Sequence, residues 1–490
     1  MDFLRVNGNK IVDSKENEVR LRGTCVGGWM NMENFIDGYP GCESGLRRAM
    51  KEILGEENGG YFFEGLLDNF FTEADAEYLH SVGANAIRLP LNYRHFEDDD
   101  KPFVYKEEGF RRLFKALDFC EKHGVYVILD MHAVQGWQNS HWHSDNENAV
   151  SLFWQHRQFQ ERLASLWQEF ARRCRGRAVV AGYELMNEPI VNTPAGDLPH
   201  MYYENYRPKW DLMNKVYREL CAKIREVDPD HIIVLEGDRY GHLFDGLEAP
   251  FTDNLIYSSH YYTLAGFGPG KYPGDFNSYR TDQADVSGYW DREKHDRIFR
   301  GSPGVRFAEK YKVPLLAGEF GSQYNTGAEE IPYRIAAMND QLDVFNAWGA
   351  HWTTWTYKDM GVMGWVTVDP ESEYTKIIAP IQKKKTELGA ENFVGWYTNP
   401  IGKQMNRQLA QTIADVISDP GINPVSNASC LSVFTLTGYA AACLQPEYCR
   451  CFKGMGKGDI DRVMQSFALK NCVVNEPYRE ILVRNLSPLP

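Results

Sequence analysis

Short apolar runs that alternate with helical patterns are the feature that most restricts how this chain of 490 residues can fold. Eight such runs occur, at 20–28, 84–91, 125–133, 179–189, 231–238, 254–262, 313–321 and 351–358. Helical patterns precede most of them, and the weakest pattern, at 241–248, precedes the sixth run. This alternation predicts βαβ units and a parallel sheet. Eight repeats favour an α/β fold of the closed (β/α)8 type, the TIM barrel, over an open sheet.

The two ends of the chain depart from this repeat. Residues 3–23 alternate around an Asn-Gly-Asn turn and predict a small β-hairpin or lid. After residue 390, helical patterns at 399–418 and 458–471 flank a break at 419–424. We therefore expect a barrel domain at 1–390 that includes the hairpin. A small, mainly helical C-terminal extension at 391–490 would follow, and the sequence does not indicate its role.

The balance of charge argues against several kinds of partner. Lys and Arg number 53 against 67 Asp and Glu, a net charge of −14, whereas nucleic acids and anionic membranes attract a surplus of cations. No run of about 18 apolar residues marks a membrane span. The charged start does not resemble a signal peptide, and the spacing of the ten cysteines fits no zinc knuckle. We expect a cytoplasmic, reducing environment unless a leader has been removed. The sequence does not indicate the oligomeric state.

Polar and aromatic residues gather at the ends of the predicted strands. The carboxyl ends of barrel strands carry active residues, because the connecting loops rise from that face. Six of the runs end with such groups, and carboxylates are almost never buried without a partner. We therefore expect one functional rim, formed by Arg88, His132, Asn187, Glu188, His260, Tyr262, Glu319 and Trp355.

Two glutamates dominate this predicted rim. Glu188 ends the fourth run and Glu319 ends the seventh, so the two would face each other across the mouth of the barrel. Glycoside hydrolysis needs such a pair, one carboxyl protonated and the other ionised. Two carboxyls about 5 Å apart differ in pKa by like-charge repulsion, which sorts the two roles.

Five motifs in order resemble glycoside hydrolase family 5, the cellulase-like family of clan A, over roughly residues 1–370. The motifs are IRLP, LDMHA, ELMNEP, HYY and AGEFG. The resemblance implies that Glu188 is the general acid/base and Glu319 the nucleophile. It also implies that Asn187 binds the 2-hydroxyl of the sugar.

The same resemblance implies supporting roles for the other rim residues. Arg88 and Tyr262 would hold Glu319 ionised and aimed, while His132 and His260 would be hydrogen-bond partners around the site. Trp355 would be the platform under the sugar. Trp352 lies an odd number of residues earlier, so it would point the other way along a regular strand.

The polar segment at 136–145 follows the third run. It resembles a loop of exo-glucanase-like members, which implies substrate contact through Trp137, Gln138 and Asn139. A zinc site of His141, His143 and Asp145 is the alternative, since imidazole and carboxylate at short spacing bind that ion. The expected reaction needs neither a metal nor another cofactor.

These features together predict a retaining O-glycosidase that acts by double displacement on β-linked glycosides or oligosaccharides. Long connections at 28–71, 190–211 and 263–304 would wall the rim into a pocket, which favours an exo-acting enzyme. The alternative is an endo-β-1,4-glucanase or mannanase with an open cleft. A non-catalytic carbohydrate-binding barrel and a metal-dependent barrel hydrolase are alternatives from other classes.

Overall fold

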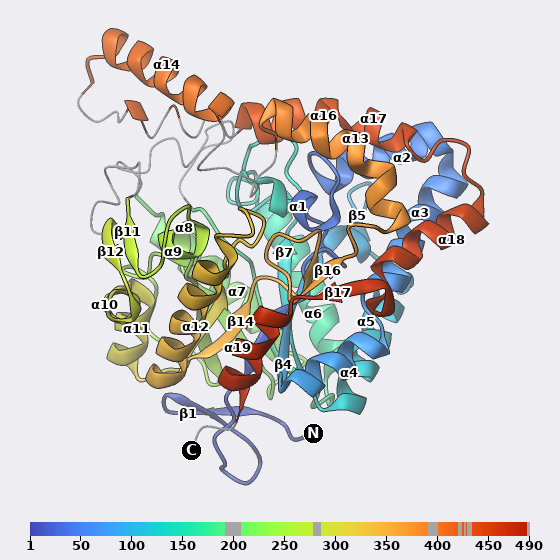
Figure 1. Ribbon diagram of the computed structural model, residues 1–490. Helices are drawn as coiled ribbons and strands as arrows, with labels where there is room; N and C mark the ends of the chain where they lie inside the picture. Colours follow the sequence, from blue (N-terminus) through green and yellow to red (C-terminus); the bar gives the residue numbers. More distant parts are fainter. Residues whose placement is uncertain are drawn as a thin grey trace.

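A closed barrel of eight parallel strands forms the centre of the molecule (Figure 1). The computed structural model describes residues 1–191, 207–277, 286–390, 400–419, 424–425, 428 and 434–487. Each barrel strand coincides with one of the eight predicted runs, so the predicted TIM barrel is confirmed. Around the barrel the strands are β3 (Arg22–Cys25), β4 (Ala86–Asn92), β7 (Tyr126–Ala133), β8 (Val180–Glu184), β9 (Ile232–Glu236), β10 (Leu255–His260), β13 (Leu315–Glu319) and β14 (His351–Thr354).

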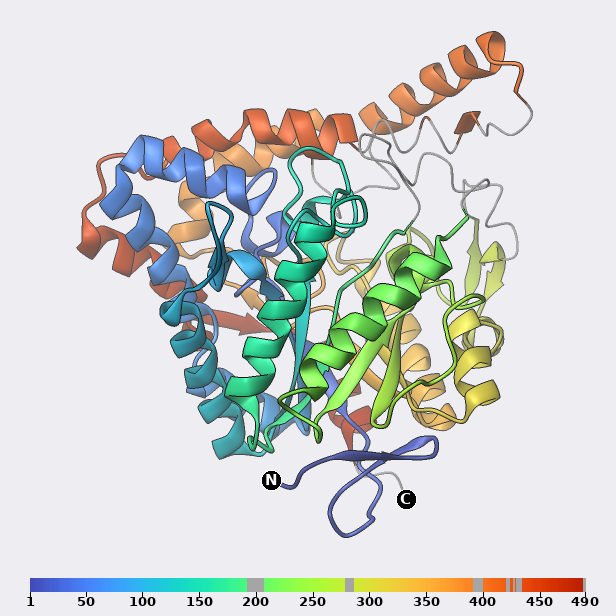
Figure 2. The ribbon, with the colours of Figure 1, turned by 180° about the vertical axis from the view of Figure 1, so that it is seen from behind.

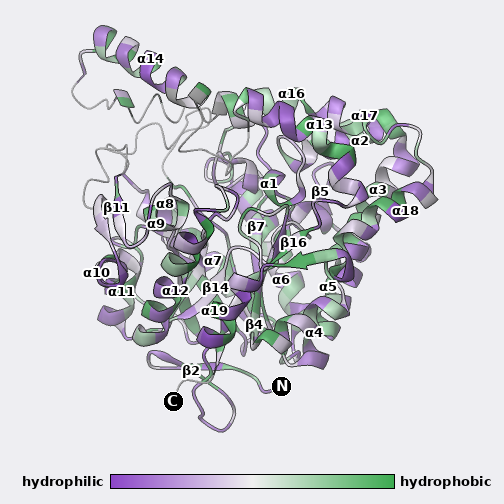
Figure 3. Cartoon of the chain, in the orientation of Figure 1, coloured by the Kyte–Doolittle hydropathy of each residue, from purple (hydrophilic) through white to green (hydrophobic). Residues whose placement is uncertain are grey.

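Helices cover the outside of the barrel, and each carries both hydrophobic and hydrophilic residues (Figure 3). They include α4 (Glu73–Val82), α5 (Glu107–His123), α6 (Arg157–Cys174), α7 (Trp210–Arg225), α11 (Pro303–Tyr311) and α12 (Ile331–Trp348). Local signals set their ends. Thr72 and Asp75 form a capping box at the start of α4, and Gly83 ends it in a left-handed conformation, φ 102°.

The weak helix expected at 241–248 does not form. The structure has only the short α8 (Asp238–Gly241) between β9 and β10. Arg239 and Tyr240 within it have left-handed φ values of 51° and 58°, so the chain turns instead of continuing as a helix.

The connection at 28–71 was expected to be a long loop, and most of it is helical. It contains α1 (Asn34–Asp37), α2 (Glu43–Leu54) and α3 (Glu56–Phe70). In α3 the buried Phe62, Phe63, Leu66, Leu67 and Phe70 recur at helical spacing. Two consecutive glycines at 59 and 60 weaken this pattern in the sequence, because glycine disfavours helix. The middle parts of the other two long connections, 192–206 and 278–285, lie outside the described residues.

The predicted N-terminal hairpin closes the end of the barrel away from the rim. It consists of β1 (Arg5–Asn7) and β2 (Lys10–Val12), paired antiparallel. Leu4, Ile11 and Leu21 form one apolar cluster with residues of six strands of the barrel floor. The N-terminus lies at this face in both views (Figure 1, Figure 2), as does the end of α19 (Glu476–Leu486). The hairpin is therefore a plug beneath the barrel and does not act as a lid over the rim.

The last part of the chain packs back onto the rest of the molecule, apart from α14 (Pro400–Val416), which projects away from the barrel (Figure 1). Helices α17 (Gln445–Arg450) and α18 (Lys457–Met464) lie against α2 and α3, and α19 (Glu476–Leu486) lies against α12 and α4. The same part includes α13 (Glu373–Leu388) and β17 (Cys472–Val474). Strand β17 pairs with β16 (Val366–Val368), which follows the last barrel strand. The predicted break at 419–424 lies mostly outside the described residues. None of the described helices combines the length and apolarity that crossing a bilayer requires.

Candidate active site

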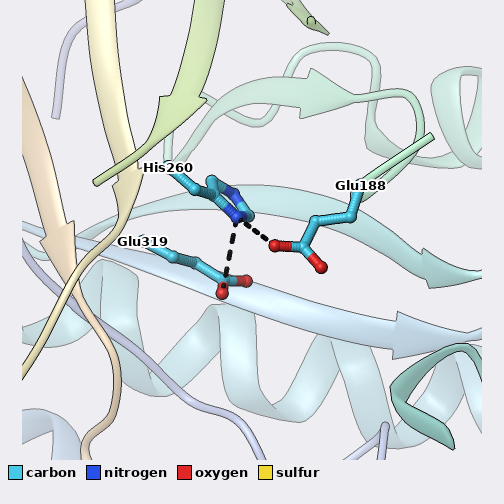
Figure 4. Close-up of side chains that lie close together, drawn as sticks. All are labelled: Glu188, His260 and Glu319. Atoms are coloured by element: carbon cyan, nitrogen blue, oxygen red, sulfur yellow. Dashed lines mark hydrogen bonds and ion pairs between the residues drawn. The ribbon is translucent and has the colours of Figure 1, made fainter. Parts of the chain in front are cut away.

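Glu188 and Glu319 meet at the carboxyl end of the barrel, with His260 between them (Figure 4). One oxygen of each glutamate and one ring nitrogen of His260 all lie within 4.8 Å of one another. Glu319 ends β13, His260 ends β10, and Glu188 follows β8. The geometry therefore brings two carboxyls from opposite sides of the mouth to the distance that one sugar ring can span.

Glu319 is held by charge and by hydrogen bonds. Arg88 Nη1 donates to its Oε1 at 2.7 Å, and the hydroxyl of Tyr262 donates to its Oε2 at 2.9 Å. Burial alone would raise the pKa of Glu319. The positive charges of His260 and Arg88 outweigh that effect, so the pKa is lowered. The site thus favours the ionised form of Glu319 and fixes the direction of its carboxylate.

Arg88 is the centre of a buried network that also includes residues we did not predict. Its Nε donates to Glu184 at 2.6 Å, and its Nη2 donates to Asn187 Oδ1 at 2.7 Å and lies 3.2 Å from Asp130. Arg88, Glu184 and Asp130 are fully buried. The sequence does contain a signal for Glu184 and Asp130, because both lie in otherwise apolar strand runs. An unpaired carboxylate is costly there, so each acid must have a partner.

Glu188 is fixed through its backbone as well as its side chain. Its φ of 47° is left-handed, a conformation that costs energy in a residue other than glycine. Its N–H donates to Glu236 Oε2 at 3.0 Å, and its carbonyl accepts from Asn139 at 2.9 Å. Its side-chain oxygens face His260 Nδ1 at 2.7 Å and His143 Nε2 at 3.2 Å. The strained turn thus presents the carboxyl between two imidazoles.

His260 carries positive charge into this site. Burial alone would lower its pKa, but Glu236 and Glu319 raise the pKa to about 9. Glu236 Oε1 lies 3.5 Å from His260 Nε2, and burial raises the pKa of Glu236 well above its usual range. Glu236 was missed at the sequence level, although it too is an acid at the end of an apolar strand.

His132 connects the rim to the first connection of the chain. Its Nδ1 lies 2.7 Å from Asp130, and its Nε2 lies 3.3 Å from Glu33. Burial alone would lower the pKa of His132, but the two carboxylates raise it to about 10. Burial raises the pKa of Glu33 to about 7. The helical connection that contains Glu33 was expected to be a loop, so this buried acid was not predicted.

Trp355 and Trp352 lie on different sides of the chain, as their spacing predicted. The Trp355 ring stacks on His132 with centroids 5.3 Å apart and planes 10° apart. Trp352 points into the core, where its Nε1 donates to Asn346 at 3.0 Å and its ring contacts Phe320. Trp355 therefore lies with the rim residues, and its role as a platform stays a prediction.

The segment 136–145 holds backbone groups of the site residues in place through hydrogen bonds. The amide of Gln138 donates to the carbonyls of His132 and Asn187 at 2.7 and 2.9 Å, and that of Asn139 donates to Glu188. Both amides are buried, so their observed partners are backbone groups rather than a surface open to substrate. Trp137 donates from Nε1 to the carbonyl of Asp145 at 2.8 Å. Substrate contact by these three residues is not seen and stays a prediction.

The alternative zinc ligands are not brought together. Asp145 accepts from the backbone of Ser44 and from Asn92, whereas His143 faces Glu188. Among the described residues, the three groups with spacing suited to a metal ion are Glu188, His260 and Glu319. Arg88 already contacts Glu319, and His260 is charged. Side chains of the protein therefore provide positive charge beside the two carboxyls, where a metal ion would otherwise provide it.

Comparison with known proteins places these features in a family. A family model described as cellulase, glycosyl hydrolase family 5, matches residues 64–361. A β-xylosidase of Phanerodontia chrysosporium is 34% identical over 502 residues, 99% of each chain. Cellodextrinase A of Ruminococcus flavefaciens is 26% identical over 52% of this chain and 70% of its own length. A solved glycoside hydrolase superimposes with a TM-score of 0.50 at 16% identity, covering 70% of this chain and 90% of that one.

Proposed function

The chain belongs to glycosyl hydrolase family 5, and from that premise we propose that it is a retaining, exo-acting β-glycosidase. Its first candidate substrate is a terminal β-xylosyl unit. The observation that carries the proposal is the pairing of Glu188 with Glu319 across the rim, with carboxyl oxygens within 4.8 Å. Carboxyls about 5–5.5 Å apart are typical of retaining enzymes, whereas inverting enzymes leave about 6.5–9.5 Å for a water.

Glu319 would be the nucleophile. Its ionised carboxylate attacks the anomeric carbon while the bond to the leaving oxygen breaks, which forms a covalent glycosyl-enzyme. Arg88 and Tyr262 leave it no freedom to turn away, since each binds one of its oxygens. A lowered pKa favours this role, because the group must be ionised before substrate binds.

Glu188 would be the acid and then the base. In the first step its proton passes to the departing glycosidic oxygen. In the second step its carboxylate takes a proton from water, the water oxygen attacks the anomeric carbon, and Glu319 leaves. Two inversions give net retention. Asn187, which Arg88 orients through Oδ1, lies next to the acid and is our candidate for the 2-hydroxyl of the sugar.

Exo action is supported by contacts of the first connection beside the rim. The side chain of Asn31 donates to the carbonyl of His143 at 3.1 Å, and Glu33 reaches His132 at 3.3 Å. The connection after β3 is thereby joined to the loop after β7 beside the rim. Connections joined in this way would wall one side of the mouth, and a mouth of that shape accepts the end of a chain more readily than its middle.

Xylosyl specificity is supported by the full-length similarity to the fungal β-xylosidase, which exceeds that to the cellodextrinase in both identity and coverage. The test is a screen of aryl β-xyloside, β-glucoside, β-mannoside and α-arabinofuranoside. We expect the xyloside to be hydrolysed with the highest kcat/KM. No turnover of any of them, with sugar binding retained, would favour a non-catalytic binding barrel.

The mode of cleavage is tested on labelled xylotriose. We expect xylose and labelled xylobiose as first products, and proton NMR should show the β-anomer of xylose before mutarotation. Cleavage of longer oligosaccharides at internal bonds from the first time point would favour the endo alternative. An α-anomer as first product would overturn the retaining mechanism.

A further inference from the structure

We propose that His143, in the loop between β7 and α6, is a second positioning residue for Glu188, which it holds as an uncharged hydrogen-bond donor. The inference rests on the proposed function, in which Glu188 transfers the proton. It assigns to His143 a role different from the metal site considered with His141 and Asp145.

The contact is direct and complements that of His260. His143 Nε2 lies 3.2 Å from Oε2 of Glu188, and His260 Nδ1 lies 2.7 Å from Oε1. The two imidazoles therefore face different oxygens of one carboxyl. His260 comes from a barrel strand, whereas His143 comes from the short 3-10 turn Trp142–Ser144.

The turn that carries His143 is built to hold it in place. Ser144 Oγ donates to the carbonyl of His141 at 2.8 Å, and Asn31 donates to the carbonyl of His143 at 3.1 Å. The same loop grips the backbone of Glu188, because Asn139 donates to its carbonyl at 2.9 Å. The loop that carries His143 thus contacts Glu188 through both its backbone and its side chain. The 3.2 Å contact therefore joins two side chains whose backbones are held in place.

The surroundings keep His143 uncharged. Its ring packs near those of His132 and His141, with centroids 5.8 and 5.5 Å away. Burial and the charges of these two histidines and of His260 lower the pKa of His143 well below its usual value. The carboxyl it faces is that of Glu188. A neutral ring with its proton on Nε2 can donate to the ionised carboxylate without adding charge.

An uncharged donor suits a group that must alternate between acid and base. A second cation beside Glu188 would favour its ionised form strongly and oppose the acid step. A neutral N–H fixes the direction of the carboxyl with less effect on its proton. His260 would thus place a positive charge beside Glu188, and His143 would fix the direction of the Glu188 carboxyl.

The test compares His143→Phe with the wild-type enzyme on two substrates of the sugar that the screen identifies, with β-xylosides first. The dinitrophenyl glycoside has a leaving group that needs no acid, whereas the methyl glycoside depends on Glu188. We expect kcat/KM to fall about 10-fold or more on the methyl glycoside and less than about threefold on the dinitrophenyl one.

Two further variants separate positioning from folding. His143→Gln places an amide N–H near the position of Nε2 and should recover most of the activity on the methyl glycoside. His156→Phe is the control, because His156 is exposed at the start of α6 and should leave both substrates unaffected.

The outcomes are distinguishable. Equal losses on both substrates, or no loss on either, would overturn the positioning role of His143. The role would also be overturned if kcat/KM on the methyl glycoside fell in His143→Phe and was not recovered in His143→Gln. If the wild-type chain hydrolyses neither substrate with any sugar, the proposed function itself fails.

Discussion

Arg88 and Glu319 form an ion pair across the inside of the barrel, with 2.7 Å between Nη1 and Oε1. Their strands are not neighbours, because β3 and β14 lie between β4 and β13. The pair thus bridges the barrel interior, where the Arg88 side chain is fully buried. One guanidinium also meets Glu184 and Asp130, so it serves three carboxylates at once.

Replacing Arg88 with methionine should destabilise the fold as well as stop catalysis. Removing one partner of a buried ion pair costs about 3–5 kcal/mol, because the remaining charges lose their compensation. Urea unfolding at pH 7 measures the loss. Arg111→Met is the control, since Arg111 pairs with Glu108 at the surface and such pairs contribute about 0–1 kcal/mol. Equal midpoints for the two variants would contradict the network.

Replacing Glu319 with alanine should abolish turnover while leaving room for a small anion. Azide would then attack the anomeric carbon in place of the carboxylate and give a glycosyl azide of inverted configuration. Product analysis by NMR reads this outcome directly. A variant that keeps the wild-type rate, with no azide adduct, would refute the assignment of Glu319 as nucleophile.

Replacing Glu188 with glutamine should affect substrates according to their leaving groups. The amide cannot protonate the departing oxygen, so formation of the glycosyl-enzyme should slow for poor leaving groups and persist for good ones. Pre-steady-state rates on a series of aryl glycosides test this. Equal slowing across the series would argue against the acid role.

His132 should make the stability of the fold depend on pH in a defined direction. Its folded pKa of about 10 lies above the ordinary value of 6.5, so the folded state binds its proton more tightly. The resulting stabilisation is fully present below pH 6.5 and is lost as pH rises through 10. Each unit between the two pKa values corresponds to about 1.4 kcal/mol.

The variant His132→Gln isolates this contribution. The difference in unfolding free energy between wild type and variant should be largest at pH 6 and shrink steadily towards pH 10. Urea titrations at pH 6, 8 and 10 measure it. A difference that stays constant over this range would mean that His132 does not hold a proton in the folded state.

The barrel could be predicted because each of its strands is short, apolar and bounded by turn or helix signals. The rim could be predicted because parallel barrel strands bring their carboxyl ends to one face, so polar residues at those ends lie together. The helices at 28–71 were missed because glycines within α3 weaken a pattern that tertiary packing of its phenylalanines restores.

The buried acids behind the rim could not be assigned from spacing alone. Glu184 and Asp130 acquire their roles only when β4, β7 and β8 bring them to Arg88. His143 is a similar case, because it reaches Glu188 from a different loop. Such contacts join residues far apart in sequence, and an acid in an apolar run indicates only that some partner must exist.

The end of the chain offers a last test, because the sequence suggested a separate extension from residue 391. In the structure α19 lies against α12 and α4, with Tyr478, Ile481, Leu482 and Leu486 buried. Arg22, at the start of the first barrel strand, donates to the carbonyls of Asn485, Leu486 and Ser487 at 2.9, 3.1 and 3.3 Å. The last helix thus covers the outside of the barrel near its first strand.

Ending the chain after residue 474 should therefore destabilise the barrel itself. Each large apolar side chain that loses its burial costs about 1.5–3 kcal/mol, so four of them cost more than about 5 kcal/mol. Thermal unfolding and hydrolysis of the preferred aryl glycoside should both decline, whereas a chain ending after residue 487 should behave as the full chain does. If the shorter chain keeps its unfolding midpoint and its kcat/KM, the last helix is an independent appendage, and the boundary suggested near residue 390 separates two units that fold alone.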